Sequence, residues 1–573
     1  MARGQSARLD QRKLLADPTL VTTIIALIVF LTLFILYPLA ILLVDAVVGE
    51  AGPTLSVFQR VLAMPSFETA ISNTLVLGLC VGIVATLVGL LFAYVEVYVN
   101  LKSRFMGGLY KLVSMLPVVS PPFVLSLSVI LLFGKAGLIT RSLLGIYDNN
   151  VYGFWGIALV QTLTFFPVCY MMFRGLLRNI DPSLEEAARD MGASRWKVFT
   201  SVTLPLVLPG MGNAFLVSFM ESIADFANPM IIGGSYDTLA TSIYLQITGA
   251  YDKQGASAMS CVLLGITLIM FIVQKYVLER KSTATLTGKA ARGRMLITDN
   301  SVRVPLAVLC GAVAVFVVAL YVCVPFGALF KTWGYDYSLT PKWFIQVFAL
   351  HHGFEAFADS FGLSLIAAPL TALLSMVIAY LVVKRRFLGR GFIEFVSMLA
   401  MAVPGTVLGV GFIRGFSSGV FRTGFMQGLY GTAAILVIVF VVRSLPTGTR
   451  SGISALRQID KSIEESAYDM GANSFQVFMT VTLPLIKDSF LSGLVTAFVR
   501  SITAISAVIL LVTPQTLMIT VQINEYAEKG AYGIACAFAT ILIIITYAAV
   551  MLMNVFIRHF GTSAKINAQS EGE

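Results

Sequence analysis

Two stretches of the chain are nearly copies of each other. Residues 181–206 read DPSLEEAARDMGASRWKVFTSVTLPL, and residues 460–485 read DKSIEESAYDMGANSFQVFMTVTLPL. Sixteen of these 26 positions are identical, whereas ordinary residue frequencies would give about two matches by chance. The copies begin 279 residues apart in a chain of 573. This sequence is therefore predicted to contain two repeats of one fold.

Weaker similarity extends the repeats beyond these copies. The run 73–94 is similar to the run 359–380, and a polar, basic stretch lies between the two halves. We predict a first repeat at 1–283, a cytoplasmic linker at 284–303 and a second repeat at 304–573.

The composition places the chain in a membrane. Hydrophobic residues make up 57% of it and charged residues 12%, about half the charged fraction of a soluble protein. The mean hydropathy is +0.86. These values exclude a soluble enzyme, a disordered protein and a nucleic-acid-binding protein. The six cysteines lie in apolar runs without a metal-ligand spacing, so we interpret them as packing residues and predict no metal site.

Apolar runs predict about twelve membrane spans, since a span needs about 20 apolar residues. The predicted spans of the first half are 20–48, 70–98, 109–134, 151–175, 203–233 and 255–279. Those of the second half are 304–330, 359–383, 392–416, 429–450, 483–512 and 531–557. The predicted fold is an all-α integral membrane protein.

The distribution of charge supports this topology. If the N-terminus is inside and the spans alternate, 30 of the 40 basic residues fall in inside segments, as the positive-inside rule expects. Both termini are then predicted to be cytoplasmic. An even number of spans in each half gives the repeats the same orientation, so they are related by a pseudo-two-fold axis along the membrane normal.

The repeated loop has the signals of a short helix–turn–helix. Asp181 and Pro182 mark a helix start, and Gly192 marks its end. Ser194 can cap a second helix. One such loop could be an ordinary amphipathic connector, but a connector does not need the same sequence twice. We therefore predict two docking elements on the cytoplasmic side.

The spacing of residues in the loop is similar to a family signature. Glu186-Ala-Ala is followed by Gly192 and by Leu204-Pro205, and the second copy has Glu465-Ser-Ala and Gly471 at the same spacing. This pattern resembles the signature of permease subunits of bacterial ATP-binding-cassette importers. The resemblance covers nearly the whole chain and implies a type I importer permease fold, in which one fused chain replaces a permease dimer.

The resemblance implies that residues 181–200 and 460–479 are coupling loops, each of which binds a cleft on an ATPase subunit. The residues it assigns to coupling are Glu185, Glu186, Asp190, Gly192, Glu464, Glu465, Asp469 and Gly471. The chain has no GxxxxGK[ST] phosphate loop. ATP and magnesium are therefore expected on two copies of a separate ATPase, and this chain is expected to bind no cofactor and to have no catalytic residue.

Two charged residues inside predicted spans are candidate gate residues, because charge within a membrane is costly and marks function. Glu221 and Arg500 each lie 16 positions after the proline of the repeated loop. We hypothesise that they pair across the translocation path. The alternative is two separate snorkelling side chains. The predicted pore and gate residues are Glu221, Asp225, Arg500, Ser501 and Thr503.

The expected substrate depends on the residues that follow Glu221 and Arg500. Residues after Glu221 and Arg500 look like those of the ferric-iron branch of fused permeases, which is similar to the thiamine and 2-aminoethylphosphonate branches. The resemblance implies ferric iron, delivered by a periplasmic binding protein across the bacterial inner membrane; a phosphonate, a sugar phosphate or thiamine stays open. A secondary transporter of the major-facilitator type is the alternative class, although the loop after the second span lacks that superfamily's Asp-Arg-x-Gly-Arg pattern.

Overall fold

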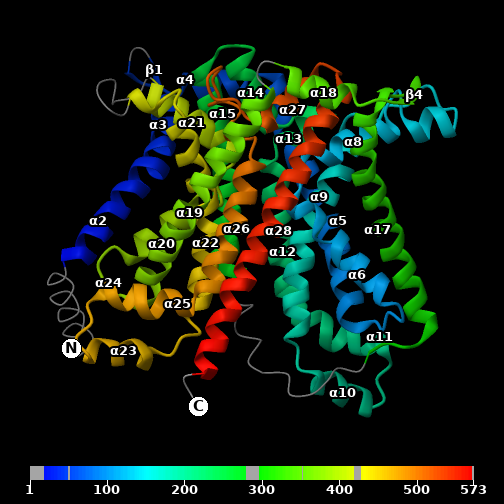
Figure 1. The fold of residues 1–573 in the computed structure, drawn as a ribbon. Coiled ribbons are helices and arrows are strands. Elements are labelled where there is room, and N and C mark those ends of the chain that lie inside the picture. Colours follow the sequence, from blue (N-terminus) through cyan, green and yellow to red (C-terminus); the bar gives the residue numbers. More distant parts are fainter. Residues whose placement is uncertain (1–17, 50–51, 279–295, 351–352, 418–426, 571–573) are drawn as a thin grey trace. The chain divides into compact units, whose positions relative to one another are not determined.

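The computed structural model describes residues 18–49, 52–278, 296–350, 353–417 and 427–570. They are almost entirely helical (Figure 1). Two short antiparallel hairpins pair β1 (Val48–Gly49) with β2 (Gly52–Pro53) and β3 (Phe330–Thr332) with β4 (Asp336–Leu339). Within the described residues, ten helices are long and apolar enough to cross a membrane, or eleven if one bent pair counts as a span. The all-α membrane fold is confirmed, with fewer continuous spans than the twelve predicted.

The third predicted span of each half is broken into shorter helices. In place of 109–134 there are α6 (Arg104–Val113), α7 (Leu116–Val119) and α8 (Phe123–Phe133), and in place of 392–416 there are α20 (Arg390–Leu399) and α21 (Gly405–Ser417). Prolines lie at the breaks, among them Pro121 and Pro404. Proline has no backbone N–H and disfavours helix in the residue before it, which favours a break at these positions.

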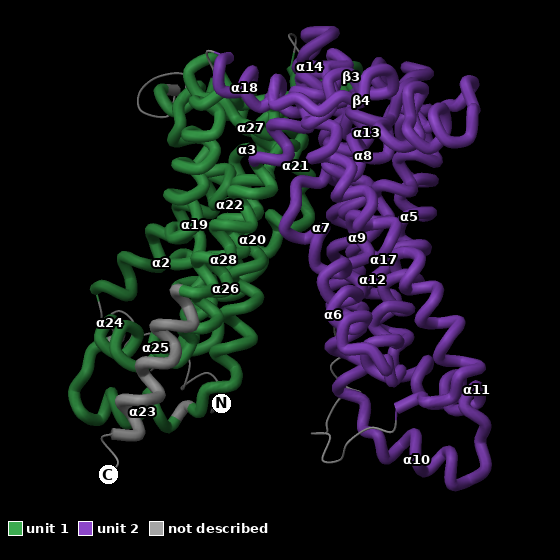
Figure 2. The backbone as a smooth tube through the Cα atoms, turned by 45° about the vertical axis from the view of Figure 1, so that its right-hand side comes forward, with its two compact units in different colours: residues 1–57, 351–521, 542–573 green, residues 58–350, 522–541 purple. Residues whose placement is uncertain are grey.

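The chain forms two compact units, shown in different colours in Figure 2. Unit 1 contains residues 1–57, 351–521 and 542–573, and unit 2 contains residues 58–350 and 522–541. Each unit has a core of three helices. In unit 2 these are α5 (Pro65–Tyr98), α9 (Phe154–Arg178) and α12 (Leu204–Ala224), and in unit 1 they are α19 (Gly353–Lys384), α22 (Ala433–Leu456) and α26 (Lys487–Ile502).

Small residues bring the core helices of each unit close together, as is common in membrane bundles. In unit 2, a Cβ added to Gly89 on α5 would lie 2.5 Å from the Cβ of Cys169 on α9. In unit 1, a Cβ added to Gly448 on α22 would lie 2.4 Å from the Oγ of Ser375 on α19. Both contacts are too short for a larger residue, so these glycines set the helix spacing.

The compact units do not coincide with the two sequence repeats. The N-terminal helices α2 (Pro18–Leu31) and α3 (Tyr37–Val47) belong to unit 1, where the Tyr37 hydroxyl donates to the carbonyl of Gly415 at 2.8 Å. Helix α17 (Asn300–Leu329) belongs to unit 2, where the Ser128 hydroxyl donates to the carbonyl of Leu320 at 2.6 Å. The first span of each repeat thus packs with the body of the other. Most of the predicted linker, 284–295, lies outside the described residues.

The remaining elements complete the order along the chain. Those before α17 are η1 (Thr32–Leu36), α4 (Ser56–Leu62), η2 (Leu138–Leu143), α10 (Pro182–Asp190), α11 (Arg195–Val198), η3 (Phe199–Thr203), α13 (Ala227–Ile232), α14 (Leu239–Thr248), α15 (Lys253–Val273) and η4 (Gln274–Leu278). Those after it are α18 (Lys342–Ala349), η5 (Gln427–Leu429), α23 (Lys461–Asp469), α24 (Ser474–Val477), η6 (Phe478–Thr482), α25 (Leu483–Leu485), α27 (Ile519–Glu528) and α28 (Tyr532–Ser570).

Candidate functional site

The repeated loop folds in the same way in both units. We name residues 181–200 coupling loop 1 and residues 460–479 coupling loop 2 after their predicted role. Loop 1 contains α10 and α11, and loop 2 contains α23 and α24. The Asp181 carboxylate accepts a hydrogen bond from the backbone N–H of Ser183 at 3.0 Å, which caps α10 and holds the pKa of Asp181 below its usual value. Asp460 caps α23 in the same way at 3.0 Å.

A glycine in the left-handed conformation ends the first helix of each loop. Gly192 has φ +83° and Gly471 has φ +87°. A residue with a Cβ is strained in this conformation, which explains why glycine is common after helix ends. The predicted helix–turn–helix is therefore present in both copies, with the turn at the predicted residue.

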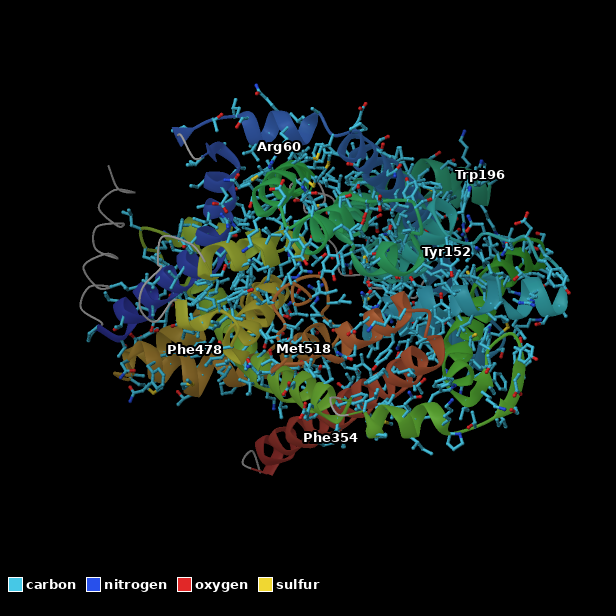
Figure 3. All side chains as sticks on the ribbon, turned by 90° about the horizontal axis from the view of Figure 1, so that it is seen from above. Arg60, Tyr152, Trp196, Phe354, Phe478 and Met518 are labelled. Carbon is cyan, nitrogen blue, oxygen red and sulfur yellow. The ribbon has the colours of Figure 1, made fainter. Side chains whose placement is uncertain are left out.

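Each coupling loop exposes three large apolar side chains at equivalent positions. In loop 1 they are Leu184, Met191 and Trp196, which are 49%, 82% and 72% exposed. In loop 2 they are Ile463, Met470 and Phe475, which are 45%, 83% and 58% exposed. Figure 3 labels Trp196 on loop 1. Solvent-exposed apolar side chains that recur at the same positions favour a protein-binding surface.

Most of the predicted coupling residues share this exposed surface. Glu186 is partly exposed, and the exposed ones are Asp190, Gly192, Glu465, Asp469 and Gly471. The surface of each loop therefore combines acidic groups with the three apolar side chains.

Glu185 and Glu464, also predicted for coupling, are buried, with 5% and 6% exposure. The Glu185 carboxylate accepts hydrogen bonds from the hydroxyl of Tyr98 at 2.6 Å and from that of Thr203 at 2.9 Å. It thereby connects coupling loop 1 to the last residue of α5 and to the end of η3. Glu185 therefore has almost no surface with which a protein partner could make contact, in contrast to its partly exposed neighbour Glu186.

Glu464 has the equivalent position in unit 1, and its contacts include a lysine. Its carboxylate accepts a hydrogen bond from Thr482 at 3.0 Å and forms an ion pair with the ammonium of Lys384 at 3.4 Å. The Lys384 side chain is only 5% exposed. Sequence reasoning missed Tyr98, Thr203, Lys384 and Thr482. The signal was present for the threonines, because they are identical between the two copies.

Aromatic pairs support each loop beside the buried glutamate. In unit 2 the ring of Tyr94 meets Phe199 edge-on, with centroids 5.5 Å apart, and in unit 1 Tyr380 meets Phe478 at 5.1 Å. Loop 2 has a further contact, because the Tyr380 and Tyr468 hydroxyls lie 3.0 Å apart and Arg385 donates to both.

The predicted gate residues lie in different units. Glu221 is on α12 in unit 2, and Arg500 is on α26 in unit 1. Within the described part of its own unit, neither side chain has a hydrogen-bond or ion-pair partner. The hydroxyls of Ser501 and Thr503 donate to carbonyls of the preceding turn, at 2.8 and 2.7 Å. Pairing of Glu221 with Arg500 stays a prediction.

Asp225 organises a buried polar network at the end of α12. Its carboxylate accepts from the side-chain amides of Gln161 at 2.9 Å and Asn228 at 2.8 Å and from the backbone N–H of Ala227 at 3.1 Å. The Asn228 carbonyl oxygen accepts in turn from Ser126 at 2.8 Å. These bonds fix the break between α12 and α13. In the described residues, no cluster of three or more His, Cys, Asp or Glu side chains could hold a metal ion.

Comparison with known proteins identifies the family. The model of the binding-protein-dependent transport system inner membrane component matches the chain twice, at residues 85–283 and 371–560. The chain belongs to this family. The two matches confirm that this permease is a fused two-repeat protein. It is a transport subunit of the ATP-binding-cassette class rather than an enzyme, and the major-facilitator alternative is excluded.

Two relatives match the permease over most of its length. It is 37% identical to the ferric transport system permease protein FbpB of Actinobacillus pleuropneumoniae over 94% of this chain and 78% of the relative. It is 36% identical to the putative ferric transport system permease protein FbpB 1 of Haemophilus influenzae over 90% of this chain and 81% of the relative. The molybdenum transport system permease protein ModB of Escherichia coli is 28% identical over 36% of this chain and 92% of its own.

Proposed function

We propose that the chain forms the translocation path of an ATP-driven importer of ferric iron. The observation that carries this proposal is the 37% identity to a ferric transport permease over 94% of the chain. The relative named for molybdenum transport matches only 36% of the chain. Its similarity therefore supports the shared fold rather than a molybdenum substrate. A phosphonate, a sugar phosphate and thiamine are the competing substrates for the same path.

The coupling loops are the proposed contacts with two copies of an ATPase. Each would place its apolar triad (Leu184, Met191 and Trp196, or Ile463, Met470 and Phe475) in a cleft of one copy, with Glu186 or Glu465 at the edge. ATP and magnesium belong to that partner. Closure of the ATPase dimer would draw the loops together and open the path outward, and hydrolysis would reset it.

The proposed orientation places both loops in the cytoplasm of a bacterium whose inner membrane holds the chain. The support is the predicted location of 30 of 40 basic residues on that side. Both chain ends are assigned to the same side, although they lie outside the described residues. A periplasmic binding protein would deliver the substrate to the opposite face.

The gate is part of the same proposal. Glu221 and Arg500 have equivalent positions in the two repeats, so a pseudo-two-fold axis would place them equally far from the path. Either charge reversal alone, Glu221→Arg or Arg500→Glu, is expected to reduce transport strongly, and the double exchange is expected to restore it. An exchange as inactive as the single variants contradicts the pair.

The test of the function is affinity purification of the chain from native membranes in mild detergent, with mass spectrometry of the bound proteins. The expected result is an ATPase with a phosphate loop, and its loss from the variant Glu186→Lys, Glu465→Lys. A matched charge reversal away from the loops, at the exposed Glu68 (Glu68→Lys), keeps both glutamates and is expected to retain the ATPase. Recovery of no ATPase from the unmodified chain contradicts the proposal.

A further inference from the structure

The segment after α8 exposes a run of apolar side chains. We name residues 143–147, which read LLGIY, the apolar turn. The backbone N–H of Ile146 donates to the carbonyl of Thr140 at 2.8 Å, and the Thr140 hydroxyl donates to the carbonyl of Gly134 at 3.1 Å, so the turn is fixed to the end of α8. Its exposed side chains are Leu143 (76%), Leu144 (59%), Ile146 (45%) and Tyr147 (74%). Exposed apolar side chains that gather in this way favour a surface that binds a partner.

The apolar turn lies beside the hairpin of β3 and β4. The hydroxyls of Ser142 and Tyr337 are 3.0 Å apart, and the indole N–H of Trp333 donates to the carbonyl of Leu131 on α8 at 2.7 Å. Figure 1 shows the segment after α8, in cyan, next to β4. Tyr335, between the two strands, is 88% exposed. The turn and the hairpin thus form one exposed apolar and aromatic surface of unit 2.

The length of α17 places this surface at the edge of the bilayer. Helix α17 begins beside coupling loop 1, where Arg195 and Asp299 form an ion pair at 3.3 Å. It has 30 residues and is therefore about 45 Å long, whereas the hydrocarbon core of a bilayer is about 30 Å thick. The end of α17 at Leu329, from which β3 follows directly, therefore reaches the headgroup region of the leaflet farther from coupling loop 1.

The lipid-facing side of α17 continues into this surface. Four exposed apolar side chains lie along one face of the helix, since they are separated by whole turns: Val308 (63%), Val315 (64%), Val322 (47%) and Phe326 (44%). The Phe326 ring stacks on Phe330 with centroids 5.9 Å apart, and Phe330 meets Tyr337 edge-on at 5.3 Å. An unbroken apolar path thus leads from the membrane-exposed face of a span to the residue that contacts Ser142, directly before the apolar turn.

The charge beside the turn suits a phospholipid. The guanidinium of Arg141 lies 5.7 Å from the centroid of the Tyr147 ring, and among the described residues it forms no ion pair. An arginine that extends to lipid phosphates from an apolar segment with tyrosine is typical of the membrane interface. A protein partner would not require that the surface continue from the lipid-facing side of a span.

We propose that the apolar turn is a membrane anchor, which inserts Leu143, Leu144 and Ile146 among the phospholipids of the leaflet farther from coupling loop 1. Arg141 and Tyr147 lie at the level of the phosphate groups. The anchor holds the neighbouring end of α17 at one depth in the bilayer. This inference goes beyond the proposed function and does not depend on the substrate.

The test places a reporter tryptophan in the apolar turn of the full chain. Leu143→Trp is compared with Met191→Trp, which changes a side chain of similar exposure, 82%, on coupling loop 1. Both variants are placed in nanodiscs of phosphatidylglycerol and phosphatidylethanolamine, and the emission of the unmodified chain with its four tryptophans is subtracted. Bromine on the acyl chains is expected to quench the added emission of Leu143→Trp by at least about twofold and that of Met191→Trp by less. Aqueous iodide is expected to quench them in the opposite order.

A second variant makes the result depend on the apolar side chains themselves. Leu144→Asp and Ile146→Asp, added to Leu143→Trp, are expected to abolish quenching by bromine. Because the two side chains are 59% and 45% exposed, thermal unfolding in detergent is expected to change little, which separates loss of insertion from loss of the fold.

Two results would overturn the proposal. If iodide and not bromine quenches Leu143→Trp, the turn faces water and a protein partner at this surface is favoured instead. If quenching by bromine persists in the triple variant, the apolar side chains do not hold the turn in the membrane. Neither measurement needs an ATPase, a binding protein or a substrate, so failure of the proposed function leaves this test intact.

Discussion

Coupling loops 1 and 2 share most of their sequence and the same backbone, yet their buried glutamates contact different residues at the ends of the core helices. Both bury the first of two adjacent glutamates and expose the second. In loop 1 the buried carboxylate accepts a hydrogen bond from the Tyr98 hydroxyl, and in loop 2 it forms an ion pair with Lys384. Identical or similar residues thus form the exposed surface of each loop, where we propose that the partner binds. The attachment to the core depends on helices outside the copied segment and is free to differ.

The largest effect is expected from charge reversal on the exposed side of both loops. Glu186→Lys combined with Glu465→Lys reverses the charge of one acidic side chain on each loop, and a reversed charge at an interface changes binding strongly. We expect transport to fall by more than about a hundredfold. Each single variant is expected to leave one loop bound and to retain part of the ATPase. If one single variant loses as much bound ATPase and uptake as the double variant, then the two loops do not each bind an ATPase copy. The measurement is ATPase retention with substrate uptake.

The next effect compares the Glu464–Lys384 ion pair with the Glu185–Tyr98 hydrogen bond. Lys384→Met breaks a buried ion pair, which typically costs about 3–5 kcal/mol. Tyr98→Phe removes a neutral donor from a buried acceptor, which typically costs about 1–3 kcal/mol. Thermal unfolding in detergent is expected to show the larger loss of stability for Lys384→Met. Equal shifts, or a larger one for Tyr98→Phe, would mean that the ion pair has no special role.

A smaller effect is expected at the ends of α12 and α26, where the repeats also differ. Asp225→Ala removes the carboxylate that accepts from the side-chain amides of Gln161 and Asn228, at a cost of about 1–3 kcal/mol. The matched variant Ser501→Ala removes a hydroxyl that donates to the preceding turn of its own helix and is expected to cost less. Thermal unfolding compares the two. A loss from Ser501→Ala as large as that from Asp225→Ala contradicts the network.

The smallest effect tests what the loops have in common. Asp181→Ala and Asp460→Ala each remove a helix cap, which typically costs about 1 kcal/mol. Because the two caps have the same geometry, the two variants are expected to raise exchange in α10 and α23 by similar factors. A strong difference between the two variants would show that the loops differ in more than the contacts of their buried glutamates.

Much of the molecule follows from patterns in the sequence. The duplication, the membrane class and the helix–turn–helix of each loop come from residue identity, composition and the positions of Asp181 and Gly192. The breaks at 114–122 and 400–404 were missed because hydropathy averaged over a window ignores prolines such as Pro121 and Pro404. That signal was available.

Other features depend on tertiary packing and leave no local pattern. Glu185 and Glu186 are adjacent and chemically identical, and only the fold decides that one lies against Tyr98 and the other faces solvent. The packing of each repeat's first span with the body of the other repeat could not be predicted either, because the apolar pattern of α2 and α17 does not say which helices they pack against. The different surroundings of Glu185 and Glu186 are therefore set by their positions relative to the core and not by residue type.

The most direct test of the account is uptake of iron by proteoliposomes that contain this chain and its ATPase, with ATP enclosed and the loaded binding protein supplied on the opposite side. The account predicts ATP-dependent accumulation of ferric iron, unaffected by an excess of phosphonate, sugar phosphate or thiamine and lost in the Glu186→Lys, Glu465→Lys variant. Uptake of one of those competitors in place of iron, or uptake that continues without ATP, would contradict it.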